Sequence, residues 1–114
     1  MRRRLLVMNG QRVLQSEQGG QWQVDKVERA AALKPGIYNL YLAMPADRAK
    51  VHEGLILHVD QEHVFQQVGK AYVAHDRTAF YRLPEVGQAK RIGYDGAKAI
   101  VADASLAKAR KLSR

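Results

Sequence analysis

Short apolar runs separated by turn-forming residues occupy the chain between residues 36 and 94. The runs are rich in Val, Ile, Leu, Tyr and Phe, and Gly, Asp, Asn or Pro interrupts them every few residues. Branched and aromatic side chains favour extended backbone, whereas the interrupting residues favour tight turns. The pattern therefore predicts several short β-strands joined by turns.

Three of the interruptions along the chain have the composition of β-hairpin turns. They are Asn9-Gly10, Asp60-Gln61-Glu62 and Asp95-Gly96, each between two runs that contain apolar residues. Asn-Gly and Asp-Gly suit two-residue turns in which both central residues take a positive φ angle. Six or seven strands in about 100 residues predict a small curled antiparallel sheet or an SH3-like or OB-like barrel.

One short helix is expected near residues 25–33. Asp25 can cap its first turn, Glu28 completes a capping box, and Lys34-Pro35-Gly36 ends it. A second, frayed helix is compatible with the residues after Asp103, where apolar anchors are few. The expected fold class is thus α+β and mostly β, with a single domain over residues 1–102 and a basic tail over residues 103–114.

The net charge of +8 is concentrated at the two ends of the chain. The candidate contacts to nucleic acid or to an acidic partner are Arg2, Arg3, Arg4, Lys108, Arg110 and Lys111. Such clusters attract phosphates and carboxylates, but they also occur as solvated ends that only raise solubility. Charge alone therefore leaves both interpretations open.

The composition also bears on location and chemistry. The chain has no Cys, which fits a reducing cytoplasm and removes thiol catalysis and cysteine zinc sites. Its apolar runs are too short for a membrane helix. His58 and His63 flank one turn without supplying three converging ligands, so neither a metal nor a cofactor is expected. Because no Ser or Thr stands in a nucleophile motif, an enzyme is not expected either.

Two kinds of binding protein fit the predicted strands. Tyr38, Phe65 and Tyr94, with Lys70 nearby, are the residue types on which a small barrel stacks single-stranded nucleic acid, although a small core needs most of its aromatics. Polar residues inside strand-like runs, such as Gln66, instead favour a protein-recognition face or an edge that accepts an added strand.

Several stretches of the chain resemble the KfrB family. They are R-L-L-V-M-N-G-Q-R-V-L-Q from Arg4, L-K-P-G-I-Y-N-L-Y-L-A from Leu33, H-E-G-L-I-L-H-V-D from His52, H-V-F-Q-Q-V-G from His63, and V-A-H-D-R, P-E-V-G and I-G-Y-D from Val73 onward. The resemblance extends from about Arg4 to Ala102.

KfrB-like proteins are small plasmid-encoded proteins, or domains of larger ones such as relaxases. The resemblance implies a non-enzymatic, cytoplasmic accessory protein in plasmid maintenance or partition, with a plasmid-encoded KfrA-type or KfrC-type protein as partner and DNA as a contact of the basic ends. The resemblance identifies no catalytic residues in this sequence. Among its pattern positions, the candidate partner-binding residues are Tyr38, His52, Gln66 and His75. The alternative function is a small β-barrel module that binds single-stranded DNA or RNA directly in plasmid transfer or regulation.

Overall fold

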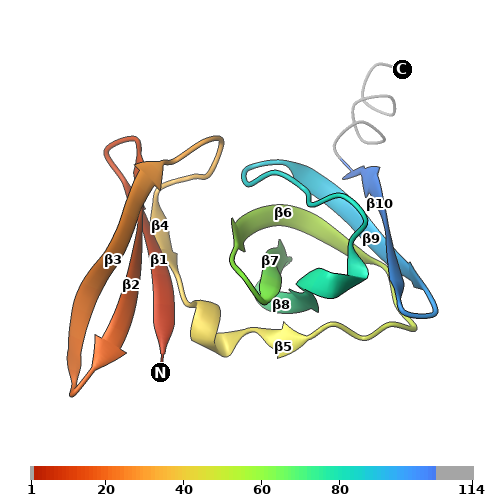
Figure 1. The fold of residues 1–114 in the computed structure, drawn as a ribbon. Coiled ribbons are helices and arrows are strands. Elements are labelled where there is room, and N and C mark those ends of the chain that lie inside the picture. Colours follow the sequence, from red (N-terminus) through yellow and green to blue (C-terminus); the bar gives the residue numbers. More distant parts are fainter. Residues whose placement is uncertain (1, 105–114) are drawn as a thin grey trace.

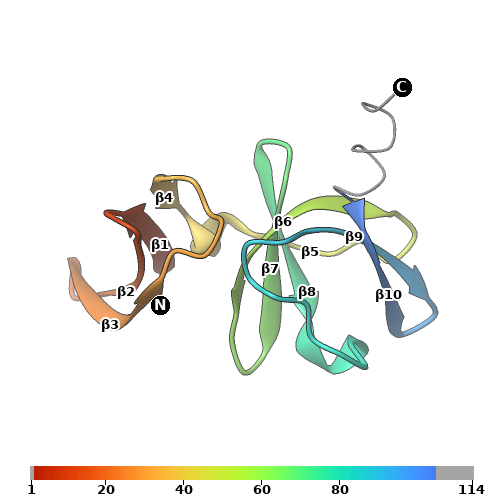
Figure 2. The ribbon, with the colours of Figure 1, turned by 90° about the horizontal axis from the view of Figure 1, so that it is seen from above.

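The computed structural model describes residues 2–104, which fold into ten strands and two single-turn 3-10 helices. The elements are β1 (Arg3–Met8), β2 (Gln11–Gln18), β3 (Gln21–Arg29), β4 (Gly36–Tyr38), η1 (Leu40–Leu42), β5 (Met44–Pro45), β6 (His52–Val59), β7 (His63–Val68), β8 (Ala71–Asp76), η2 (Arg77–Ala79), β9 (Ala89–Asp95) and β10 (Lys98–Asp103). Figures 1 and 2 show two sheets side by side. Along the chain, η1 joins the four strands of the first sheet to β5, the edge strand of the second.

The first four strands form an antiparallel sheet in the spatial order β3-β2-β1-β4. The predicted hairpin at Asn9-Gly10 is confirmed, because these residues join β1 to β2 with φ angles of 53° and 74°. Gly19-Gly20 forms the next turn, also at positive φ. The register between β2 and β3 shifts once, between Leu14 and Gln15, which marks a β-bulge.

The remaining strands form a six-stranded sheet in the order β10-β9-β6-β7-β8-β5. The predicted hairpins around 60–62 and 95–96 are confirmed, because antiparallel pairs join β6 to β7 and β9 to β10. In the second hairpin Asp95 ends β9 and pairs with Lys98, so the turn itself consists of Gly96 and Ala97. The edge strand β5 is the exception, because Met44 and Pro45 pair with β8 in parallel. Pro45 has no backbone N–H, which weakens β5 as a template for a further strand.

Two parts of the predicted fold are wrong. Residues 21–29 are the strand β3 and not part of a helix over 25–33, because the Gly19-Gly20 turn places them beside β2, where a full ladder of pairs outweighs local helix capping. The sheets do not close into a barrel, since β3, β4, β5 and β10 all remain edge strands. The frayed helix expected after Asp103 lies outside the described residues apart from Ala104.

Apolar packing joins the two sheets. One buried cluster combines Leu5 and Val7 of β1 with Leu57 of β6 and Phe65 of β7. At the same boundary the Arg3 guanidinium contacts the Asp60 carboxylate at 2.6 Å. A second cluster forms within the six-stranded sheet around fully buried side chains, which are Ile56, Val64 and Ile92. The four-stranded sheet is therefore held against β6 and β7 by both packing and an ion pair.

Candidate functional site

A buried hydrogen-bonded network ties β7 to β6, β8 and β9. Its centre is the Gln66 side chain on β7, which is fully buried. The Gln66 amide nitrogen donates to three backbone carbonyls, those of His52 at 3.2 Å, Gly54 at 3.2 Å and Lys90 at 2.9 Å. With its nitrogen turned toward three acceptors, Gln66 presents its oxygen to His75 Nε2 at 2.8 Å. One amide thus links four strands of the sheet.

This arrangement determines the protonation of His75. Because the Gln66 oxygen can only accept, His75 Nε2 carries the proton and donates it. The other ring nitrogen, Nδ1, then accepts from the Tyr94 hydroxyl at 2.6 Å. Burial, helped by the neighbouring His52 ring, lowers the pKa of His75 from 6.5 to about 4. At neutral pH, His75 is therefore a neutral imidazole with both nitrogens engaged inside the domain.

Gly54 permits the close approach of β6 and β7 beside this network. A Cβ atom at this position would lie 1.7 Å from the Gln67 backbone oxygen. Real atoms do not approach so closely, so only glycine fits without a shift of one strand. The pairing of β6 with β7 also changes register nearby, between Ile56 and His58.

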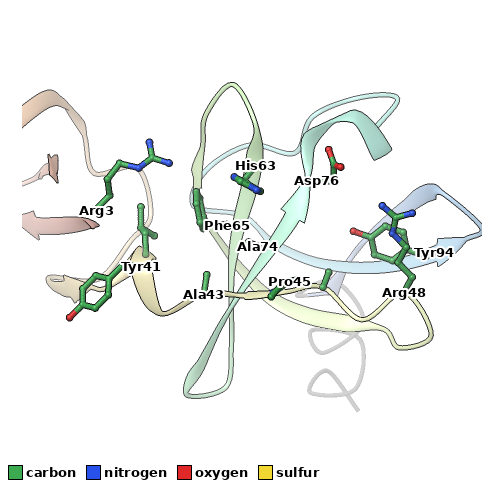
Figure 3. A pocket seen from close by; sticks show the side chains of 12 residues that line it. Arg3, Tyr41, Ala43, Pro45, Arg48, His63, Phe65, Ala74, Asp76 and Tyr94 are labelled. Atoms are coloured by element: carbon green, nitrogen blue, oxygen red, sulfur yellow. The ribbon is translucent and has the colours of Figure 1, made fainter. Parts of the chain in front are cut away.

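An open groove of about 540 Å³ runs beside η1 and β5 (Figure 3). Arg3 lies at one end, and Arg48 lies with Tyr94 at the other. Phe65 and Ala74 contribute an apolar wall from β7 and β8. The Arg48 guanidinium carbon lies 5.6 Å from the centre of the Tyr94 ring, a cation–π geometry. Since the Tyr94 hydroxyl bonds His75, the buried network holds one end of the groove in place.

The cations of the groove have carboxylates close to them. Arg3 is paired with Asp60, as described above. Near the other end, hydrogen bonds from the Thr78 hydroxyl and backbone amide lower the pKa of Asp76, and the nearby charges of Arg48 and His63 lower it further. The groove therefore combines apolar, aromatic and balanced charged groups.

Comparison with known proteins places the second half of the chain in a family. Residues 51–103 match the family model described as KfrB Domain. These residues form a KfrB domain. Protein TraB of Escherichia coli is 34% identical over 94 residues, which cover 80% of this chain and 64% of that protein. The chain thus spans less than two thirds of that relative, and together the two matches indicate a plasmid-associated protein.

The KfrB domain comprises strands β6 to β10 and so contains the whole Gln66–His75 network. It also supplies the Phe65, Ala74 and Tyr94 part of the groove, whereas Arg3 and Arg48 come from outside the matched residues. The predicted resemblance is confirmed for residues 51–103. For the stretches quoted from Arg4 and Leu33, it stays a prediction.

The four candidate partner-binding residues are all buried. The exposed fraction is 7% for Tyr38, 8% for His52 and 0% for both Gln66 and His75. The last three meet in the network, whereas Tyr38 lies in the core between the sheets and donates from its hydroxyl to the Lys34 carbonyl at 2.6 Å. Partner contact by these four residues stays a prediction. A partner that binds the surface of the folded domain would contact neighbouring residues such as Tyr94 before it reached them.

The basic N-terminal residues are part of β1 or flank it. Arg3 is engaged at the sheet boundary, and Arg4 lies over the Trp22 ring with its guanidinium carbon 4.0 Å from the ring centre. Arg2 lies 5.3 Å from the centre of the Tyr41 ring. The other candidate contacts, Lys108, Arg110 and Lys111, lie outside the described residues.

Sequence reasoning missed Arg48 and Asp76 as groove residues. Arg48 lies in the loop after Pro45 and carries no motif, whereas Asp76 ends β8 and its sequence context indicates only a cap for η2. Only the folding of the chain brings them to the same groove. Among residues 2–104, no three His, Asp or Glu side chains are arranged to hold a metal ion. The same part of the chain has no helix with the length and apolar character needed to cross a membrane.

Proposed function

We propose that this chain is a non-enzymatic accessory protein of plasmid maintenance or partition, which binds a plasmid-encoded partner of the KfrA or KfrC type through the groove. The KfrB domain supports the plasmid role. The composition of the groove supports a protein as its ligand, and this is the observation that carries the proposal.

A protein segment suits the groove better than a phosphate backbone does. Nucleic-acid sites concentrate positive charge, because each phosphate is an anion that a Lys or Arg has to neutralise. Here Arg3 is already paired with Asp60, and Asp76 lies near Arg48. An apolar wall with balanced charges at its ends matches the mixed chemistry of a polypeptide.

The buried network supports a binding role over a catalytic one. His75 is the histidine with the most strongly lowered pKa among the described residues, but both its ring nitrogens bond within the domain. A general base needs a free nitrogen within reach of a substrate proton. His75 instead orients Tyr94 at the groove.

Titration calorimetry with purified KfrA-type and KfrC-type proteins from the same plasmid tests the proposal. Arg48→Ala is expected to weaken binding at least about tenfold, as for an interface arginine that anchors one end of a bound segment. Lys50→Ala is the matched control, because Lys50 is an exposed cation in the same loop that does not line the groove. The proposal fails if neither protein binds the folded chain, or if Arg48→Ala binds as tightly as the unsubstituted chain.

Direct binding of single-stranded nucleic acid is the second candidate function. The observation in its favour is the stacked Arg48–Tyr94 pair, because aromatic rings and arginine planes are platforms for unpaired bases. Anisotropy titration of labelled single-stranded DNA at low and near-physiological salt tests it. Binding that persists at the higher salt and is lost in Tyr94→Ala would support this function over the protein adaptor.

A further inference from the structure

The face of the four-stranded sheet that points away from the six-stranded sheet carries exposed apolar side chains. We call it the outer face. Residues opposite one another in antiparallel strands share a face of the sheet, so the register defines its rows. One row crosses all four strands and consists of Val27, Val13, Leu6 and Ile37. The intervening residues of β1, Leu5 and Val7, point to the opposite face and are buried in the shared core.

The two ends of this row are open to solvent, whereas Leu6 and Val13 between them are partly exposed. Ile37 is 53% exposed and Val27 is 50% exposed. On the same face, Val24 is 58% exposed and Met8 is 45% exposed. Apolar residues scattered singly over a surface need no explanation, but a contiguous patch across a whole sheet is typical of a binding surface.

The charged residues of the outer face are mostly basic. Arg4 shares the row of Val24, and Arg29 shares the row of Met8. Arg2 and Glu17 lie at one end, 3.8 Å apart, so they largely offset each other. The Arg4 and Arg29 charges remain, and on this face they complement a carboxylate-bearing partner.

We infer that the outer face docks an acidic amphipathic helix of a partner protein. A helix fits because the bare face of a sheet is buried in folded proteins by helices or by another sheet. The six residues of β1 span about 20 Å, which a helix of about 13 residues matches. Its apolar stripe would cover the Val27–Ile37 row, and its acidic residues would meet Arg4 and Arg29.

The same observations disfavour two other occupants. A second copy docked by the same face would bring two sets of arginines together, and their repulsion opposes a symmetric dimer. A nucleic acid would gain little from the central row, because Val and Ile bind neither phosphates nor the edges of bases. The outer face lies outside the KfrB domain, so this inference does not depend on the proposed groove function.

Peptide display on the full chain tests the inference. A library of random peptides of about 16 residues, long enough for four helical turns, is selected on the unsubstituted chain and counter-selected on Val27→Glu. Recovered peptides are expected to be acidic and to carry apolar residues with helical spacing. Val27→Glu should weaken their binding at least about tenfold, measured by anisotropy, and Arg4→Gln should reduce the salt dependence of binding.

Gln23→Glu is the matched control, because it adds the same charge to an exposed position of β3 on the other face of the sheet. It should leave affinity within about twofold, as should Arg48→Ala in the groove. Circular dichroism confirms that each variant is folded.

Three results would overturn the inference. The first is recovery of no Val27-dependent peptides, or of peptides that are neutral or basic. The second is a concentration-dependent dimer in analytical ultracentrifugation that Val27→Glu abolishes, which would assign the face to a second copy. The third is binding of labelled single-stranded DNA at physiological salt that Val27→Glu removes.

Discussion

Replacing Gln66 with Leu tests the buried network at its centre. Leu has nearly the volume of Gln and keeps the site apolar, but it can neither donate nor accept a hydrogen bond. The change removes the bond from His75 Nε2 at 2.8 Å and the bond to the Lys90 carbonyl at 2.9 Å. It also removes the two longer bonds to carbonyls of β6. The backbone ladder around the site is untouched.

The expected loss of stability follows from the groups left without partners. A buried donor such as His75 Nε2–H costs about 1–3 kcal/mol when unsatisfied, and the lost bond to the Lys90 carbonyl contributes about 1 kcal/mol. If the His75 proton moved to Nδ1, the unsatisfied N–H would disappear, but Nε2 would then be a buried acceptor without a hydrogen-bond donor. The better burial of Leu offsets about 1 kcal/mol. The free energy of unfolding should therefore fall by about 1–3 kcal/mol.

Urea denaturation at pH 7, followed by circular dichroism, measures this change. For a domain of this size, 1–3 kcal/mol corresponds to a fall in Tm of about 5–15 °C. Gln67→Leu is the matched control, because Gln67 is the next residue of β7 and points to the other face. It should change stability by no more than about 0.5 kcal/mol. If Gln66→Leu proves as stable as Gln67→Leu, the network does not stabilise the domain and the reasoning is refuted.

Three further predictions rest on single features of the fold. As pH falls from 6.5 to about 4, His75 is protonated in the unfolded chain before it is protonated in the folded one, so the His75 contribution to stability is complete above this window and falls by on the order of 3 kcal/mol across it. Urea denaturation at pH 7 and at pH 5 should show a smaller loss of stability for His75→Gln than for the unsubstituted chain. An equal loss would contradict the lowered pKa of His75. Gly54→Ala should lower the free energy of unfolding by more than about 2 kcal/mol, because the added Cβ would overlap a backbone oxygen of β7. In the control Gly93→Ala, the added Cβ would lie 3.4 Å from its nearest neighbour, so the loss should be less than about 1 kcal/mol. Thermal denaturation of both variants measures the difference. A double-mutant cycle with Ala at Arg3 and Asp60 should give a coupling free energy of about 1 kcal/mol, and added salt should reduce it. A coupling of zero would mean that the ion pair does not help to hold the two sheets together.

Local sequence predicted the turns better than the strands between them. Asn9-Gly10 and Gly96 lie in hairpin turns as expected, because glycine's freedom at positive φ is a property of the residue itself. The second turn lies one residue later than Asp95-Gly96, since Asp95 pairs with Lys98 in the ladder. Residues 25–29 became strand despite a capping signal at Asp25 and Glu28. Capping contributes about 1 kcal/mol, which pairing along a whole neighbouring strand exceeds.

The candidate site was predicted only in part. Gln66, His52 and His75 were singled out as positions of the KfrB pattern, and they do act together, but as a buried network. Whether a polar strand residue faces solvent or the interior depends on what covers that face, which the alternation pattern does not specify. Arg48 carried no signal, since its role comes from its place beside Tyr94.

The sequence by itself determined the mostly β character, the three hairpins and the KfrB resemblance over residues 51–103, because these depend on residues close together along the chain. Tertiary structure alone decided that the strands form two open sheets, that Gln66 meets carbonyls of β6 and β9, and that Arg3 and Arg48 occupy the two ends of one groove. Each of these joins residues far apart in sequence, so it depends on which strands pair and on how the two sheets pack.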